Sequence, residues 1–126
     1  MAYTVNLTQS QIDKWLTDLR SGNYEQGSGE LFLPDGRHCC LGVLCRSLPN
    51  VSITPIRRDL NPEIRVMAAT FQDDVFPSFS SSENVPPELI PQEAQDILTS
   101  MNDLKRLSFY QIADWIQTNL TPAEPN

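Results

Sequence analysis

The 126-residue chain has the length of one domain, and its 40% hydrophobic and 20% charged residues are ordinary for a globular protein. It contains no apolar run near the roughly 18 residues of a membrane span, and its first residues lack the pattern of a secretory signal. Its net charge of −7 disfavours general binding to nucleic acids, whose phosphates an acidic protein repels. We therefore expect a single domain, residues 1–126, that resides in the cytoplasm and has no membrane partner.

The first predicted helix, at about residues 8–21, has clear signals at both of its ends. Thr8 is a favourable N-cap, Gln11 completes a capping box, and Gly22 is a C-terminal stop. Apolar residues recur at helical spacing between these signals, which predicts one buried face. That face comprises Ile12, Trp15, Leu16 and Leu19.

Residues 23–48 are predicted to contain a hairpin and a short buried helix. The hairpin consists of a strand at 30–33, a turn at 34–36 that contains proline and glycine, and a return at 37–39. The following helix is expected at 40–48, because its apolar residues share one face.

The second half of the chain is predicted to begin with a strand at 64–71 and a mobile serine- and proline-rich loop at about 73–87. A helix follows at about 91–102, with its first proline at the N1 position. The last helix starts with a second capping box, Ser108 with Gln111. The predicted fold class is α+β, with about four short helices packed on a small antiparallel sheet or hairpin. The residues predicted to be buried are Ile12, Leu16, Leu19, Leu41, Leu44, Cys45, Ile112 and Ile116.

Three cysteines, Cys39, Cys40 and Cys45, lie within seven positions. An odd number in one cluster is a poor disulfide framework, so we expect reduced thiols. Together with His38 they are zinc-ligand types, but a second ligand cluster is missing. A cysteine at a helix start is also a candidate nucleophile, yet the only histidine is its immediate neighbour rather than a base from elsewhere in the chain. We interpret the cysteines as core residues and assign no catalytic residue, no metal and no cofactor.

Positive charge is concentrated in residues 37–65, which contain five arginines, two acidic residues and no lysine. These arginines either pair with the abundant carboxylates or bind an anion, and the planar guanidinium suits phosphate well. Two nearby residues of a glycine-flanked loop could add stacking and hydrogen bonds to a ligand. Phe76 and Phe79, in the polar loop, are candidates either for a ligand contact or for the core. The candidate ligand-binding residues are Tyr24, Gln26, Arg37, Arg57, Arg58 and Arg65.

Three segments carry a family resemblance: LRSGNYEQGSGEL (19–31), RHCCLGVLC (37–45) and MNDLKRLSFYQIADWI (101–116). The order of these segments and the residues in them resemble a family of small uncharacterised proteins of bacteriophages and prophages. Its pattern is Tyr-x-Gln-Gly-x-Gly-x-Leu, then Cys-Cys-Leu-Gly-Val-Leu-Cys, then Ser-Phe-x-x-Ile-Ala-Asp. The resemblance covers about half of the chain and leaves the middle, 49–87, unmatched. It implies a phage origin, and it implies no catalytic role for any residue.

The leading hypothesis is a phage-encoded binding protein that counters host defence in the cytoplasm of the host cell. It would do so by sequestering a nucleotide-derived immune signal through arginine–phosphate contacts. One alternative is an inhibitor that binds a host protein directly. Another is a cysteine hydrolase or phosphodiesterase that acts on a signalling nucleotide, and a further one is a virion or replication accessory protein. The sequence leaves these hypotheses open, and it does not indicate an oligomeric state.

Overall fold

The computed structural model describes residues 2–33, 36–48, 51–57, 65–71, 79–81 and 84–124, with the backbone alone between residues 52 and 81. Within these residues four α-helices and five strands confirm the predicted α+β class. None of the described helices is long and apolar enough to cross a bilayer. The helices are α1 (Gln9–Arg20), α2 (Cys40–Ser47), α3 (Gln92–Thr99), the π-helical turn η1 (Ser100–Leu104) and α4 (Phe109–Asn119). The strands are β1 (Tyr3–Thr8), β2 (Val51–Arg57), β3 (Arg65–Phe71), β4 (Phe79–Ser81) and β5 (Leu120–Glu124).

The first and last helices begin at capping boxes, as predicted. The backbone N–H of Gln11 donates to the Thr8 hydroxyl at 3.2 Å, and the Gln11 side chain accepts from the Thr8 N–H at 2.9 Å. Ser108 and Gln111 make the same reciprocal pair at the start of α4. Gly22 follows α1 with a φ of +79°, a left-handed conformation that glycine adopts without a steric penalty.

The two-stranded sheet that joins the chain ends differs from the predicted antiparallel arrangement. Strands β1 and β5 pair in parallel, with Tyr3 opposite Leu120. A parallel pair joins segments that are distant in sequence and has no tight turn between them. The sequence therefore offers no local signal for it, unlike a hairpin. Pro122 lies inside β5, where it is tolerated because a strand at a sheet edge does not need every N–H in the ladder.

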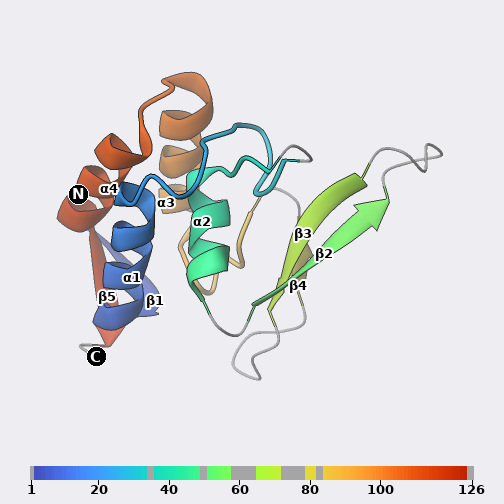
Figure 1. Cartoon of the computed structure of the whole chain (residues 1–126). Coiled ribbons are helices and arrows are strands. Elements are labelled where there is room, and N and C mark those ends of the chain that lie inside the picture. Colours follow the sequence, from blue (N-terminus) through green and yellow to red (C-terminus); the bar gives the residue numbers. More distant parts are fainter. Residues whose placement is uncertain are drawn as a thin grey trace.

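A second sheet, antiparallel and of order β2–β3–β4, lies on the side of α2 and α3, away from α1 and α4 (Figure 1). The strand predicted at 64–71 is confirmed as β3. Of the predicted mobile loop at 73–87, residues 73–78 and 82–83 lie outside the described residues, and its mobility stays a prediction. The part that is described forms β4 and then residues 84–87, in which Val85 and Pro86 are buried.

The hairpin predicted within residues 30–39 is present in a minimal form. Phe32 and His38 form one antiparallel bridge, and the N–H of Leu33 donates to the Arg37 carbonyl at 2.8 Å. His38 also bridges Gln26 in parallel, which folds the chain before the hairpin back onto it. Three short segments are thus held together by a single residue, and the turn residues 34–35 lie outside the described part of the chain.

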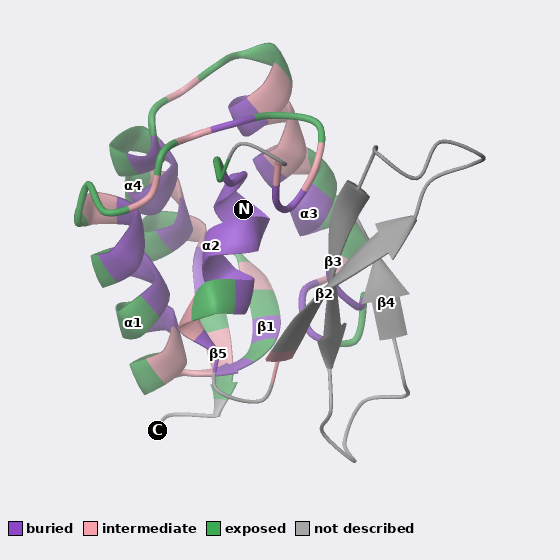
Figure 2. Cartoon of the chain, turned by 45° about the vertical axis from the view of Figure 1, so that its right-hand side comes forward, coloured by how far each residue is buried: buried purple, intermediate pink, exposed green. Residues whose placement is uncertain are grey.

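All eight residues predicted to form the core are buried, so that prediction is confirmed. Helix α2 is central, and Figure 2 shows it buried on most of its surface. The indole N–H of Trp15, in α1, donates to the Cys40 carbonyl at 3.0 Å. Gly42 allows α2 to approach the preceding segment closely, because a Cβ atom at this position would lie 1.9 Å from the Leu31 carbonyl oxygen.

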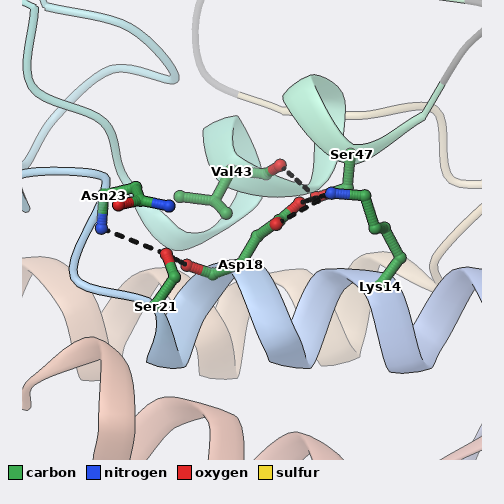
Figure 3. Close-up of polar contacts among 6 residues, drawn as sticks. All are labelled: Lys14, Asp18, Ser21, Asn23, Val43 and Ser47. Atoms are coloured by element: carbon green, nitrogen blue, oxygen red, sulfur yellow. Dashed lines mark hydrogen bonds and ion pairs between the residues drawn. The ribbon is translucent and has the colours of Figure 1, made fainter.

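A buried carboxylate fastens α1 to α2 (Figure 3). Asp18 accepts hydrogen bonds from the Lys14 ammonium at 2.9 Å and from the Ser47 hydroxyl at 2.6 Å. Lys14 precedes it by one turn of α1, whereas Ser47 comes from the last turn of α2. A charged group at this depth is stable only with such partners.

The helix predicted at 91–102 is confirmed in part and ends differently. Pro91 is the N-cap of α3 rather than its first residue, and the helix widens into η1. The N–H of Lys105 donates to the Ser100 carbonyl at 2.9 Å, and the N–H of Leu107 donates to the Met101 carbonyl at 2.9 Å. Short π-helical turns of this kind are frequent at functional sites.

Candidate functional site

A hollow of about 380 Å³ lies between the loop after α1 and the end of η1. We call this loop, which contains Gly27 and Gly29, the glycine loop. We call the hollow the Arg106 hollow. Its described lining carries two guanidinium groups and no carboxylate, in a chain whose net charge is −7. The lining residues are Gln26, Gly27, Ser28, Arg37, Asn102 and Arg106.

A network of side-chain amides forms the floor of the Arg106 hollow. Asn102, which is only 3% exposed, donates from Nδ2 to the Gly27 carbonyl and to Asp103 Oδ1, both at 2.7 Å. Its Oδ1 accepts from Gln26 Nε2 at 3.1 Å, and Gln26 Nε2 also donates to the Leu107 carbonyl at 2.6 Å. The network ties the glycine loop to η1, so the two walls of the hollow are held in fixed relation.

Arg106 stands in an unusual backbone conformation. Its φ of +53° is the left-handed value that usually belongs to glycine after a helix end. A residue with a side chain costs about 1 kcal/mol more than glycine in this conformation. Within the described part of the chain, the exposed Arg106 side chain has no hydrogen-bond or ion-pair partner. Strained positions of this kind cluster at functional sites.

Gly27 places the second arginine at the rim of the Arg106 hollow. A Cβ atom on Gly27 would lie 2.5 Å from Leu33 Cδ1 and 2.9 Å from Arg37 Cβ. The Gly27 N–H donates to the His38 carbonyl at 2.7 Å, which keeps the loop against the hairpin. Glycine at this position therefore permits the close approach that brings Gln26 and Arg37 to one site.

Of the six residues predicted to bind a ligand, the structure brings two together. Gln26 and Arg37 line the Arg106 hollow. Tyr24 lies in the same loop, but its ring packs edge-on against His38, with ring centroids 5.1 Å apart.

The remaining predicted arginines belong to the antiparallel sheet. Arg57 and Arg65 occupy opposite positions where β2 ends and β3 begins, and Figure 1 shows this end of the two strands pointing away from α1 and α4. Their side chains are not described, and Arg58 lies outside the described residues. The aromatic contacts predicted for Phe76 and Phe79 stay predictions. Phe76 lies outside the described residues, and only the backbone of Phe79 is described, as part of β4.

Sequence reasoning missed four of the six lining residues, namely Gly27, Ser28, Asn102 and Arg106. One signal was present in the sequence, because each of the three segments on which the sequence analysis based a family resemblance supplies a residue to the Arg106 hollow. Segment 19–31 supplies Gln26, Gly27 and Ser28, segment 37–45 supplies Arg37, and segment 101–116 supplies Asn102 and Arg106.

A second hollow, of about 390 Å³, adjoins the first and shares Asn102 with it. We call it the acidic hollow, because its described lining includes Glu30, Asp96 and Asp103 but no basic residue. Glu30 continues the same glycine loop, and Asp103 follows Asn102 in η1. The two hollows therefore have opposite charge and a common wall.

The cysteines are free and buried, as expected for core residues. Burial raises the pKa of the Cys39 thiol to about 12 and also raises the pKa values of Cys40 and Cys45. All three are therefore protonated at neutral pH, a state in which a thiol is a poor nucleophile. The described residues contain no group of three or more histidine, cysteine or acidic side chains that could hold a metal ion.

His38 is buried and positions the glycine loop through its backbone, but it does not line the Arg106 hollow. Its Nε2 accepts from Arg46 Nε at 3.2 Å, and its Nδ1 is buried without a hydrogen-bond partner. Burial, and next the Arg46 charge, lower the pKa of the ring, with a weaker opposing effect from the Gly36 backbone. The imidazole is therefore neutral near pH 7. The backbone carbonyl of His38 accepts the hydrogen bond from Gly27 that keeps the glycine loop in place.

Comparison with known proteins gives one match. Residues 7–50, which include α1, the glycine loop and α2, are similar to a family described as a domain of unknown function (DUF8296). No curated protein and no solved structure matches the chain. Four of the six residues that line the Arg106 hollow fall within the matched segment, namely Gln26, Gly27, Ser28 and Arg37.

Proposed function

We propose that the chain is a binding protein for a small phosphorylated ligand, and that the phosphate lies in the Arg106 hollow. Two guanidinium groups from distant parts of the sequence, Arg37 and Arg106, line this hollow. Arginine binds phosphate through parallel, charge-assisted hydrogen bonds. The floor beneath them is already fixed by the amide network, so little ordering would be needed on binding.

The observation that carries the proposal is the state of Arg106. Glycine would relieve the left-handed backbone, yet the position holds a cationic side chain without a described partner at the edge of a hollow. A ligand anion would supply the missing counter-charge. A purely structural role would be better served by glycine.

The biological setting follows from the resemblance to phage proteins. In that setting we propose that the protein counters host defence by sequestering a nucleotide-derived immune signal in the cytoplasm of the host cell. Sequestration needs only binding, and the buried, protonated state of the cysteines weighs against the alternative of a cysteine hydrolase.

A host protein is the second candidate for the partner. Leu104 is 80% exposed and Tyr110 is 60% exposed, and both flank Arg106 in sequence. Exposed apolar side chains next to an arginine are common at protein interfaces. A protein partner would contact this surface instead of filling the Arg106 hollow.

The test is calorimetric titration of the 126-residue protein with AMP, ADP-ribose and cyclic nucleotides. We expect binding by the wild type and a loss of about ten- to a hundredfold in Arg106→Gly, the usual effect of one charge-assisted contact. Lys105→Ala is the matched control, because it removes the same charge from the neighbouring residue, which does not line the hollow. Absence of binding to every compound would contradict the proposal and favour a protein partner.

A further inference from the structure

We infer that Gln26 is a specificity-determining residue of the Arg106 hollow. It selects a phosphorylated ligand that carries a hydrogen-bond donor, a hydroxyl or an amino group, beside the phosphate. The inference rests on the proposed function and narrows its ligand class. It follows from the orientation of two side-chain amides in the lining, Gln26 and Asn102, which their hydrogen bonds fix.

The amide of Asn102 has only one acceptable orientation. Its Nδ2 lies 2.7 Å from the Gly27 carbonyl oxygen and 2.7 Å from Asp103 Oδ1. A backbone carbonyl accepts hydrogen bonds and cannot donate one, so the reverse orientation would set two oxygens against each other. Asn102 is buried, and a mismatched polar group at that depth is costly. Its Oδ1 is therefore the atom that meets Gln26.

That orientation fixes the amide of Gln26 in turn. Gln26 Nε2 donates to Asn102 Oδ1 at 3.1 Å and to the Leu107 carbonyl at 2.6 Å. An amide nitrogen has two hydrogens, so these two bonds use its whole donor capacity. The amide oxygen, Oε1, can accept two hydrogen bonds, and a single donor from elsewhere in the chain would still leave it one lone pair.

Gln26 therefore contributes an acceptor to the Arg106 hollow. The hollow has the volume of a small-ligand pocket, so a group at Gln26 and a phosphate at Arg106 can belong to one compound. A phosphate, carboxylate or carbonyl oxygen at Gln26 Oε1 would place acceptor against acceptor. The ligand group that meets Gln26 should therefore be a donor attached near the phosphate.

Ser28, which also lines the hollow, does not make this distinction. Its hydroxyl rotates to suit its partner, so it can donate to a phosphate oxygen or accept from a ligand donor. Gln26 lacks that freedom, because its amide nitrogen is held at two points. The loop that carries it is held as well, by the bond from the Gly27 N–H to the His38 carbonyl. Ser28 is therefore the matched control for Gln26 in the glycine loop.

The experiment compares three phosphate monoesters by calorimetry on the 126-residue protein. The carbon chain of n-propyl phosphate has no donor, that of glycerol 3-phosphate has hydroxyl groups, and that of O-phosphoethanolamine has an ammonium group. We expect a donor-bearing ester to bind about three- to tenfold tighter than n-propyl phosphate, the usual effect of one hydrogen bond. Preference for glycerol 3-phosphate identifies the donor as a hydroxyl, and preference for O-phosphoethanolamine identifies it as an amino group.

The variant Gln26→Met tests whether Gln26 causes the preference. Methionine has an unbranched side chain of similar length without the amide oxygen, so the variant should bind the preferred ester and n-propyl phosphate within about twofold of each other. Ser28→Ala should keep the wild-type preference. Damage to the site would weaken both esters together, so the ratio of their affinities separates selection by Gln26 from a loss of structure.

Three results would overturn the inference. Equal binding of all three esters by the wild type shows that the site reads the phosphate alone, and it leaves the proposed function intact. A preference that persists in Gln26→Met shows that another group accepts from the ligand. If none of the esters binds to the wild type, the inference and the proposed function both fail.

Discussion

The substitution Gly42→Ala in α2 tests whether helix propensity or close packing decides the stability of the protein, because the two predict changes of opposite sign. In a free helix, alanine is favoured over glycine by about 1 kcal/mol, so propensity alone predicts a more stable protein. In this fold the new Cβ atom would lie 1.9 Å from the Leu31 carbonyl oxygen and 2.8 Å from its carbon. Contacts below 3.0 Å are not sustained, so the Leu31 oxygen must retreat by about 1.1 Å.

The cost of that retreat has two parts. Overpacking of a close-packed interior typically costs about 1–3 kcal/mol. The same Leu31 oxygen accepts a hydrogen bond from the Cys39 N–H at 3.2 Å, and losing it leaves a buried donor that costs a further 1–3 kcal/mol or so. After the helix-propensity gain is subtracted, we expect a net loss of about 3 kcal/mol.

Urea unfolding followed by circular dichroism measures this effect. A loss of about 3 kcal/mol corresponds to a midpoint lowered by about 1–3 M, given the usual slope for a small protein. Gly29→Ala is the control, because its φ of +89° causes strain but a Cβ atom there meets nothing within 4 Å. It should cost only about 1 kcal/mol. A Gly42→Ala protein as stable as the wild type, or more stable, would refute the close approach of α2 to Leu31.

Three further outcomes are expected. Asp18→Asn should lose about 1.5–3 kcal/mol of stability in urea unfolding, since a charged acceptor for Lys14 and Ser47 is removed, and an unchanged midpoint would show that the cluster does not hold α1 to α2. The three cysteines should react with a thiol reagent at pH 8 only after unfolding, because burial raises their pKa values; fast reaction of the native protein would contradict their burial. His38 has a lowered pKa in the folded state, so the unfolded chain binds its proton more readily and stability should fall as the pH drops below about 6.5. His38→Gln should reduce this dependence, and an identical pH profile for the variant would show that other groups cause it.

Arg106→Gly should change binding and stability in opposite directions. Removal of the guanidinium weakens phosphate binding, while glycine in the left-handed conformation leaves stability unchanged or raises it by about 1 kcal/mol. Thermal unfolding without ligand measures the second effect. A variant that loses both stability and binding would indicate that Arg106 supports the fold.

Much of the fold could be predicted because its signals are local. The capping boxes at Thr8 and Ser108 mark helix starts by residues three positions apart, and apolar spacing identified every predicted core residue. The parallel pairing of β1 with β5 was missed because its partners come from opposite ends of the chain. Its alternation was visible, since Val5 and Leu7 are buried whereas Thr4 and Asn6 are exposed, but the short segment next to a helix cap was not interpreted as a strand.

The candidate site was predicted only in part, for a related reason. Gln26 and Arg37 are close in sequence, and the concentration of arginines suggested an anion site to which the loop residue Gln26 could add hydrogen bonds. Asn102 and Arg106 reach that loop only through tertiary packing, by way of the π-helical turn and the left-handed exit from it. No spacing rule connects positions that far apart. The density of positive charge along the sequence favoured Arg57, Arg58 and Arg65 as anion-binding residues, but Arg57 and Arg65 belong to the antiparallel sheet and not to the Arg106 hollow.

The most direct test of where an anion binds is a phosphate titration followed by ¹H–¹⁵N NMR. We expect saturable shifts at the side-chain amides of Gln26 and Asn102 and at the backbone amides of Gly27 and Ser28, since these groups form the Arg106 hollow. Arg106→Gly should abolish these shifts, and Lys105→Ala should preserve them. Shifts confined to the strand ends at Arg57 and Arg65, with the hollow unchanged, would contradict the proposed site and place anion binding on the antiparallel sheet.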